Sequence, residues 1–275
     1  LPWTIILLLP WSIFLPLAIA RIRFWQREAW RSAPRSTQLG LFAFFWFAVI
    51  FLFFSAAVTK LSGYILPLMP AGVIVVALYW GERMKNGTSE ETKALPFLIS
   101  AGVNLLILLL LAVASFWSPY LAGNDPTMPA WKADLQATGL PLKGAIIWGL
   151  ASLLGIGLLL RRRYWRWFWS ANLLGFFAFL AVVVPPTIPF LDAQRQQPFR
   201  QISRLIPKVA RPQEEVFLMG FMRYSAVYYA QRRIEFFDDV QYARDYLKDP
   251  ARSKSNSSTV LILAEPRFIA KFNLH

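Results

Sequence analysis

The chain has 275 residues, of which 56% are hydrophobic and only 16% are charged, and its formal net charge is +14. So little charge excludes a soluble globular protein of this size, because charged side chains normally cover much of such a surface. This excess of basic residues does not indicate a nucleic-acid partner, since the positive charge lies largely in short segments between apolar stretches.

Six apolar stretches are of a length to cross a membrane, which takes about 20 residues of helix. We therefore predict a helical membrane bundle of about six spans. Residues 1–20 resemble a signal peptide, but their basic residues, Arg21 and Arg23, follow the apolar part instead of preceding it, so we interpret them as a span. The predicted spans are residues 1–20, 38–58, 64–80, 95–117, 144–160 and 167–190.

Basic residues gather on alternate connections between these spans. The Lys/Arg rule places such connections in the cytoplasm. We therefore predict a multi-pass protein of the plasma (inner) membrane, with its N-terminus and everything after residue 190 outside the cytoplasm. The basic connections carry Arg21, Arg23, Arg27, Arg31 and Arg35, then Arg83, Lys85 and Lys93, and finally Arg161, Arg162, Arg163 and Arg166, whereas the other two carry Lys60, Lys132 and Lys143.

The segment that joins the second and third spans is unusual, because it has almost no loop. Its sequence runs from Lys60 through Gly63 and Tyr64 to Pro67 and Pro70. Gly63 allows a tight reversal, and the prolines disturb the first turns of the next helix. An amine, a phenol and freed backbone N–H groups at headgroup depth would suit a lipid phosphate. The alternative is that Lys60 extends to the headgroups and Tyr64 joins the interfacial aromatic residues.

The sequence changes character near residue 192. We predict a transmembrane bundle at 1–192 and a small extracytoplasmic α/β domain with a parallel sheet at 193–275, near the lower size limit for an independent core. Its first helix places Phe199, Ile202, Ile206 and Val209 at helical spacing. The predicted helices are 198–209, 224–231 and 240–247, the strands are 216–221, 233–237 and 260–264, and 254–258 is a polar loop.

Few residues offer conventional catalytic chemistry. The chain has no cysteine and one histidine, His275, which excludes thiolate sites, histidine metal clusters and a Ser-His-Asp triad within it. The acidic residues indicate no metal site. The C-terminal domain has no G-x-G-x-x-G motif for a nucleotide. It does contain basic residues that can bind anions, although a solvated basic surface is the favoured interpretation: Arg223, Arg232, Arg233 and Arg244.

Residues 60–70, Lys-Leu-Ser-Gly-Tyr-Ile-Leu-Pro-Leu-Met-Pro, resemble the K-L-x-x-Y-[IL]-L-P-x-x-P segment of membrane glycosyltransferases that use polyprenyl-phosphate sugars. The chain is similar to the aminoarabinose transferases within the protein mannosyltransferase superfamily of GT-C fold, and residues 2–12 resemble the span before that motif. The motif covers about a dozen residues, although the order of elements agrees over the whole chain. Ser62 stands where the family often has proline, so the local turn can differ.

This resemblance implies an enzyme that transfers a sugar from a polyprenyl-phosphate donor to a lipid, glycan or protein acceptor at the outer face of the membrane, without a metal or other cofactor. Lys60 and Tyr64 would contact the donor phosphate by charge and by a hydrogen bond. The family's catalytic carboxylate lies near its N-terminus, and no segment here matches it. Neither Asp125 nor Asp134 lies in a matching motif. We therefore expect the chain to be the C-terminal half of such an enzyme, with its catalytic residues upstream.

Two other functions compete with this interpretation. A transporter or lipid flippase usually carries ionisable residues within its spans, and the predicted span interiors lack them; Asn104 and Asn172 are the strongly polar candidates there. Hydrogen bonds between helices are the favoured explanation of both. The other alternative is a non-enzymatic membrane anchor that presents the C-terminal domain.

Overall fold

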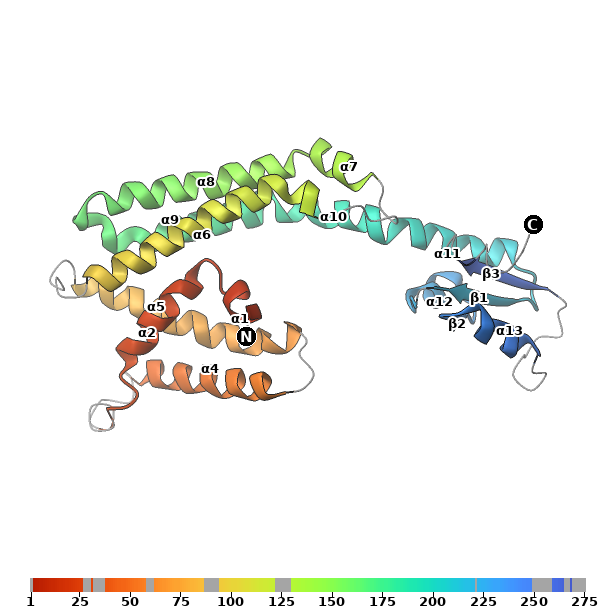
Figure 1. Cartoon of the computed structure of the whole chain (residues 1–275), viewed down its shortest axis with the longest axis horizontal. Helices are drawn as coiled ribbons and strands as arrows, with labels where there is room; N and C mark the ends of the chain where they lie inside the picture. The colour runs from red at the N-terminus through yellow and green to blue at the C-terminus, as the bar shows by residue number, and fades with distance from the viewer. Residues whose placement is uncertain are drawn as a thin grey trace. The chain divides into compact units, whose positions relative to one another are not determined.

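The computed structural model describes residues 2–26, 31, 38–57, 62–86, 94–121, 130–220, 222–248, 259–264 and 268. The chain divides into two compact units, Leu1–Pro186 and Thr187–His275. The first unit is helical (Figure 1). Its elements are α1 (Pro2–Leu7), η1 (Trp11–Phe14), α2 (Leu15–Ile22), α4 (Leu39–Ala56), η3 (Ser62–Leu68), α5 (Met69–Asn86), α6 (Ala94–Leu121), α7 (Trp131–Ala137), α8 (Leu140–Leu159), η5 (Arg162–Trp167) and α9 (Phe168–Val182).

Among the described residues, four helices are long and apolar enough to cross a membrane. They are Leu39–Ala56, Gly63–Lys85, Leu95–Leu121 and Leu140–Leu159, which confirms the second to fifth predicted spans. The sixth predicted span corresponds to a bent pair of helices, with α10 (Val184–Arg195) following α9, and the pair makes a fifth span if it is counted as one.

The first predicted span is wrong as a continuous helix. Helix α1 ends at Leu7, and the chain resumes as η1 and α2 after a break at residues 8–10. Proline lacks the N–H that continues a helix and its ring clashes with the preceding turn, so Pro10 explains the break. The apolar helix that follows, Trp11–Ile22, extends roughly 18 Å at 1.5 Å per residue. That length is well short of a hydrocarbon core about 30 Å thick.

A hydrogen bond from α6 compensates for this break. The Asn104 side-chain amide donates to the backbone carbonyl of Pro10 at 2.7 Å, and Asn104 is fully buried. A carbonyl released from a helix inside apolar surroundings must find such a donor. For Asn104, the prediction of a hydrogen bond between helices is confirmed. Asn172, equally buried on α9, makes none with the residues that the structure describes.

Small residues let the helices of the first unit approach closely. Helix α8 contacts both α6 and α9. A Cβ added at Gly175 would lie 2.7 Å from the Ala151 Cβ, and one added at Gly155 would lie 2.8 Å from a methyl group of Leu105. Contacts of this kind drive helix association in lipid, where apolar burial gives little advantage.

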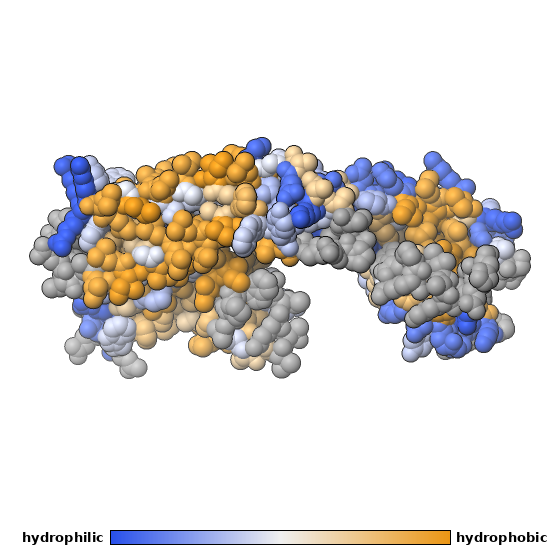
Figure 2. Space-filling view, turned by 45° about the horizontal axis from the view of Figure 1, so that its top comes forward, coloured by the Kyte–Doolittle hydropathy of each residue, from blue (hydrophilic) through white to orange (hydrophobic). Residues whose placement is uncertain are grey.

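Apolar side chains also cover the outside of this unit. Figure 2 shows hydrophobic residues over most of the visible face of the helices, with hydrophilic residues gathered near the helix ends. Such a surface is stable against lipid and would be a liability in water. Side chains that are more than half exposed include Phe42, Leu52, Leu106, Leu150, Leu153 and Phe177.

The second unit is a small α/β fold. Its sheet is parallel, in the order β2-β1-β3, which confirms the predicted parallel arrangement. In register, Phe217 of β1 pairs with Glu235 of β2 and with Ile262 of β3. The elements are α11 (Gln197–Val209), β1 (Glu215–Met219), α12 (Ser225–Ala230), β2 (Glu235–Phe237), α13 (Val240–Lys248) and β3 (Val260–Ala264).

Helices cover both faces of this sheet. Val216 and Leu218 pack with residues of α11 and α12, and Phe217 and Met219 pack with α13 on the other face. The first strand is therefore buried on both sides, as its continuous apolar sequence requires. The predicted polar loop at 254–258 lies outside the described residues.

The four apolar residues at helical spacing on α11 differ in burial. Ile206 is buried and Phe199 packs beside it, but Ile202 is 46% exposed and Val209 is 66% exposed. Helical spacing alone identifies a wide apolar arc, and the small sheet covers only one side of that arc.

We expect Asn104→Leu to destabilise the protein and Asn172→Leu to leave its stability unchanged or increased. The first substitution removes the donor to the Pro10 carbonyl, which costs about 1–3 kcal/mol when the carbonyl stays buried. The second replaces a buried amide that has no described partner by an apolar group of similar size. Thermal unfolding in detergent micelles measures both, and equal destabilisation of the two variants would contradict this role of Asn104.

Candidate functional site

The segment before α5 folds as a 3₁₀ helix, η3, in which side chains repeat every three residues. Leu68 is fully buried and Ile65 is half-buried, one turn apart on the same side. They pack with Leu8 of the broken N-terminal segment and with Phe47 of α4. One side of η3 is therefore fixed to the helical unit.

Tyr64 lies on the other side of η3 and is 45% exposed. Its ring packs against Phe54 of α4 at a centroid distance of 5.6 Å and an interplanar angle of 30°. Within the part of the chain that the structure describes, its hydroxyl makes no hydrogen bond. The phenol is thus held by its ring, while its hydroxyl keeps its capacity to donate to a ligand.

The prolines of the motif act as predicted. Pro67 lies inside η3, and regular α-helix begins only at Met69, followed by Pro70. Gly63 lies within η3 without a left-handed backbone angle, and a Cβ added there would meet nothing within 4 Å. The residues before it, 58–61, lie outside the described residues, so the reversal itself stays a prediction.

Two residues named in the sequence analysis cannot be placed, because the structure does not describe them. Lys60 lies outside the described residues, so its proximity to Tyr64 rests on the sequence alone. Asp125 also lies outside them, whereas Asp134 lies in the first turn of α7.

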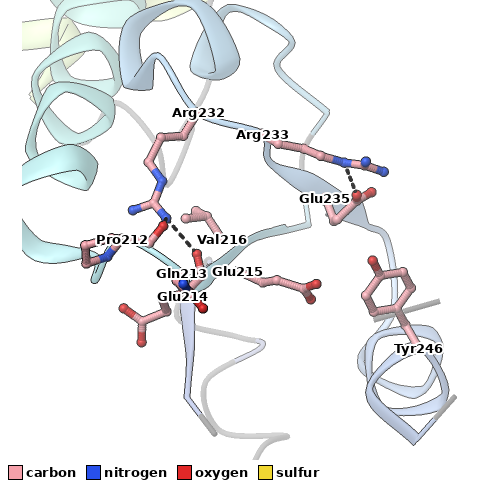
Figure 3. A pocket seen from close by; sticks show the side chains of 9 residues that line it. All are labelled: Pro212, Gln213, Glu214, Glu215, Val216, Arg232, Arg233, Glu235 and Tyr246. Carbon is pink, nitrogen blue, oxygen red and sulfur yellow. Dashed lines mark hydrogen bonds and ion pairs between the residues drawn. The ribbon is translucent and has the colours of Figure 1, made fainter. Parts of the chain in front are cut away.

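A second group of polar residues lies in the α/β unit, around a pocket of about 170 Å³. Figure 3 shows carboxylates, two arginines and Tyr246 at this pocket. Glu215 and Glu235 begin β1 and β2, so the pocket lies at the amino-terminal edge of the parallel sheet. The sequence analysis did not predict this group. A usable signal was present, because Glu215 directly precedes one predicted strand and Glu235 lies within the next, and residues at the same end of parallel strands meet at one edge of the sheet.

Arg232 organises the backbone at this edge. Its guanidinium donates to the carbonyls of Pro212 and Glu214, each at 2.9 Å. It also donates to the carbonyl of Ala210 at 3.4 Å. Figure 3 shows the Arg232 side chain directed toward the segment before β1. These three carbonyls belong to the chain between α11 and β1, so Arg232 fixes the entry into the sheet. Arg233 instead pairs with Glu235 through Nε at 2.6 Å, with a side chain that is 64% exposed.

A backbone hydrogen bond and burial shift two pKa values at this edge. The backbone N–H of Arg211 donates to the Glu214 carboxylate at 3.0 Å and lowers the pKa of that group. Partial burial raises the pKa of Tyr246, and the carboxylates of Glu215 and Glu235 raise it further. Tyr246 therefore stays a neutral phenol at physiological pH, and the edge carries more negative than positive charge.

The four arginines named in the sequence analysis do not form one anion site. Arg232 is occupied by carbonyls, Arg233 is paired with Glu235, and the Arg223 guanidinium lies 5.5 Å from the Phe199 ring centroid. Arg244 has an interaction partner of its own. This arrangement agrees with a basic surface whose charges have separate structural partners.

Comparisons with known proteins support the family resemblance. The model of the C-terminal domain of cyanobacterial RgtA-type glycosyltransferases matches residues 209–274, which include most of the α/β unit and its pocket. Curated relatives named undecaprenyl phosphate-alpha-4-amino-4-deoxy-L-arabinose arabinosyl transferase are also similar. The relative from Edwardsiella ictaluri is 33% identical over 213 residues, which are 76% of this chain and 34% of that protein.

Two further relatives agree. The protein from Photorhabdus laumondii is 28% identical over 60% of this chain and 27% of its own length. The protein named transferase 2 from Sodalis glossinidius is 29% identical over 71% of this chain and 32% of its own length. The predicted resemblance to aminoarabinose transferases is thereby confirmed. The chain spans about a third of the length of the curated relatives it matches. No solved structure matches the chain significantly.

We expect Arg232→Ala to destabilise the α/β unit far more than Arg233→Ala does. The first substitution leaves carbonyls before β1 without their charged donor, at a cost of about 1.5–3 kcal/mol, whereas an exposed ion pair contributes about 0–1 kcal/mol. Hydrogen exchange of the β1 amides in the purified protein measures the difference. Equal protection in both variants would show that the carbonyl contacts of Arg232 do not stabilise the sheet.

Proposed function

We propose that the protein carrying this chain is a membrane glycosyltransferase that moves a sugar from a polyprenyl-phosphate donor to a lipid, glycan or protein acceptor at the outer face of the membrane. The observation that carries this proposal is the similarity to proteins named for arabinosyl transfer and for undecaprenyl phosphate, which extends over 213 residues for the relative from Edwardsiella ictaluri. The helices of membrane-crossing length supply the surroundings that an isoprenoid chain requires.

Lys60 and Tyr64 are the proposed contacts to the donor phosphate. The exposed phenol of Tyr64 on η3 supports its part, because its ring packs against Phe54 while the residue is 45% exposed. Lys60 precedes it by four residues in the motif and would supply positive charge. A charged and a neutral donor together would stabilise the phosphate as it becomes the leaving group.

The reaction would be a substitution at the anomeric carbon of the sugar. The acceptor oxygen forms a bond to that carbon, the bond from carbon to the phosphate oxygen breaks, and polyprenyl phosphate leaves with the electron pair. A carboxylate acts as general base and takes the acceptor's proton. We assign no residue of this chain to that role.

The topology follows the charge distribution. We propose that residues 1–192 form the membrane bundle, that residues 193–275 form an extracytoplasmic domain, and that the basic connections face the cytoplasm of a cell with the chain in its inner membrane. On that arrangement, η3 lies at the outer face, where the acceptor would meet the donor.

We expect Lys60→Ala in the full-length protein to reduce sugar transfer at least tenfold, because a charge-assisted contact to the phosphate contributes about 1.5–3 kcal/mol. Radiolabelled polyprenyl-linked sugars incubated with membrane extracts give the rate. Lys143→Ala removes an exposed lysine in the first turn of α8 and is the matched control. Undiminished transfer by the Lys60 variant would remove this residue from the site.

Tyr64→Phe distinguishes the contribution of the hydroxyl from that of the ring, because it removes only the hydroxyl. The packing against Phe54 is retained, so we expect normal stability together with transfer that is about tenfold slower, through loss of one hydrogen bond to a charged group. The control is Tyr120→Phe, which alters a tyrosine that is 56% exposed on α6. Equal transfer by the two variants would mean that Tyr64 contributes only its ring.

A further inference from the structure

A cavity of about 600 Å³ lies between α2, α4 and α5, within the helical unit. It is lined by the last turns of α2 and α5, the turn that follows α2, and the beginning of α4. These are the ends of two membrane-length helices, Leu39–Ala56 and Gly63–Lys85. If those helices cross the membrane, the cavity lies where hydrocarbon gives way to headgroups.

The polar part of the lining is basic. Arg21, Arg23 and Lys85 line the cavity against one carboxylate, Glu82. Arg21 is held in place, because its guanidinium pairs with Glu82 at 3.3 Å and lies 5.3 Å from the Tyr79 ring centroid. The cavity therefore carries a positive excess that a bound anion would neutralise.

Arg23 and Lys85 are the cations best suited to meet such an anion. Both are exposed, and neither forms an ion pair with any residue that the structure describes. Arg23 ends α2 in the left-handed conformation, at φ 50°, which turns the chain sharply at the cavity. Gln26 and Gln38 add two carboxamides to the same lining.

The remaining lining is apolar. Ile22 of α2, Leu39 and Leu41 of α4, and Val75 and Leu78 of α5 all contribute. A small soluble anion would gain nothing from this surface. A phospholipid would place its phosphate and glycerol among the cations and carboxamides and its acyl chains along the apolar residues.

We propose that this cavity binds the headgroup of an anionic phospholipid from the surrounding bilayer. It is separate from the proposed donor contacts, because η3 precedes α5 and the cavity lies at the far end of that helix. Met69 and Lys85 are separated by roughly 24 Å at 1.5 Å per residue. By the Lys/Arg rule, this end faces the cytoplasmic leaflet, where anionic lipids are attracted by basic residues.

Native mass spectrometry of the detergent-purified full-length protein tests the proposal, with added phosphatidylglycerol, phosphatidylcholine or inorganic phosphate as probes. We expect retention of phosphatidylglycerol over phosphatidylcholine, and no competition by inorganic phosphate at equal concentration. The double variant Arg23→Gln/Lys85→Gln should weaken retention by about fivefold for each lost charge, roughly thirtyfold in all. Arg161→Gln/Arg163→Gln, which removes exposed charges that do not line the cavity, should retain the lipid.

A second variant blocks the space without changing charge. Gly81 lines the cavity, and a Cβ added there meets nothing within 4 Å, so Gly81→Phe starts its side chain in open space and directs a ring toward the cavity volume. Gly149→Phe, at a glycine of α8 with equally open surroundings, is its control. Loss of phosphatidylglycerol from the Gly81 variant alone supports the cavity.

Three results would overturn the proposal. Unchanged retention by the double variant and by Gly81→Phe would exclude the cavity as the binding site. Equal loss in the Arg161/Arg163 variant would indicate general attraction to a basic surface. Equal retention of phosphatidylcholine, or displacement by inorganic phosphate, would exclude an anionic phospholipid as the specific ligand.

Discussion

The helical unit depends on one constraint, which is that a backbone carbonyl released inside apolar surroundings must find a donor from the protein itself. The break after α1 creates this problem at Pro10, and Asn104 of α6 solves it with a buried hydrogen bond. The same bond joins the beginning of the chain to a helix 94 residues later. The break after α1 is thereby tied directly to α6.

The two units are stabilised by different interactions. In the helical unit, Gly155 and Gly175 let α8 approach its neighbours, since apolar contact with lipid and with another helix are nearly equivalent. In the α/β unit, water is the alternative to burial, so β1 lies between two apolar layers and Arg232 holds the backbone that leads into it. Close packing therefore stabilises the helical unit, where lipid is the alternative surrounding, and apolar burial stabilises the α/β unit, where water is the alternative.

The sequence predicted most elements because their signals are local. The strands of the α/β unit are short apolar runs between polar turns, and all three appear in the structure close to their predicted positions. The first span failed because hydropathy measures composition along a window and is insensitive to a break at Pro10. Ile202 and Val209 show a related limit, since helical periodicity identifies an apolar arc without saying how much of it a partner covers. The cavity near Arg23 and the edge near Tyr246 were not predicted, because each combines residues that are distant in the sequence.

The 3₁₀ form of η3 makes the length of that segment a stricter requirement than most of its residue types. Each residue in such a helix advances by about 120°, so one inserted or deleted residue rotates everything before it by a third of a revolution relative to the anchored Leu68. Tyr64 would then face a different neighbour, even with every side chain retained. Leu66 is 55% exposed and a Cβ added at Gly63 meets nothing within 4 Å, so substitution of either residue disturbs the packing less than a change in the spacing between the aromatic ring and the helix that follows.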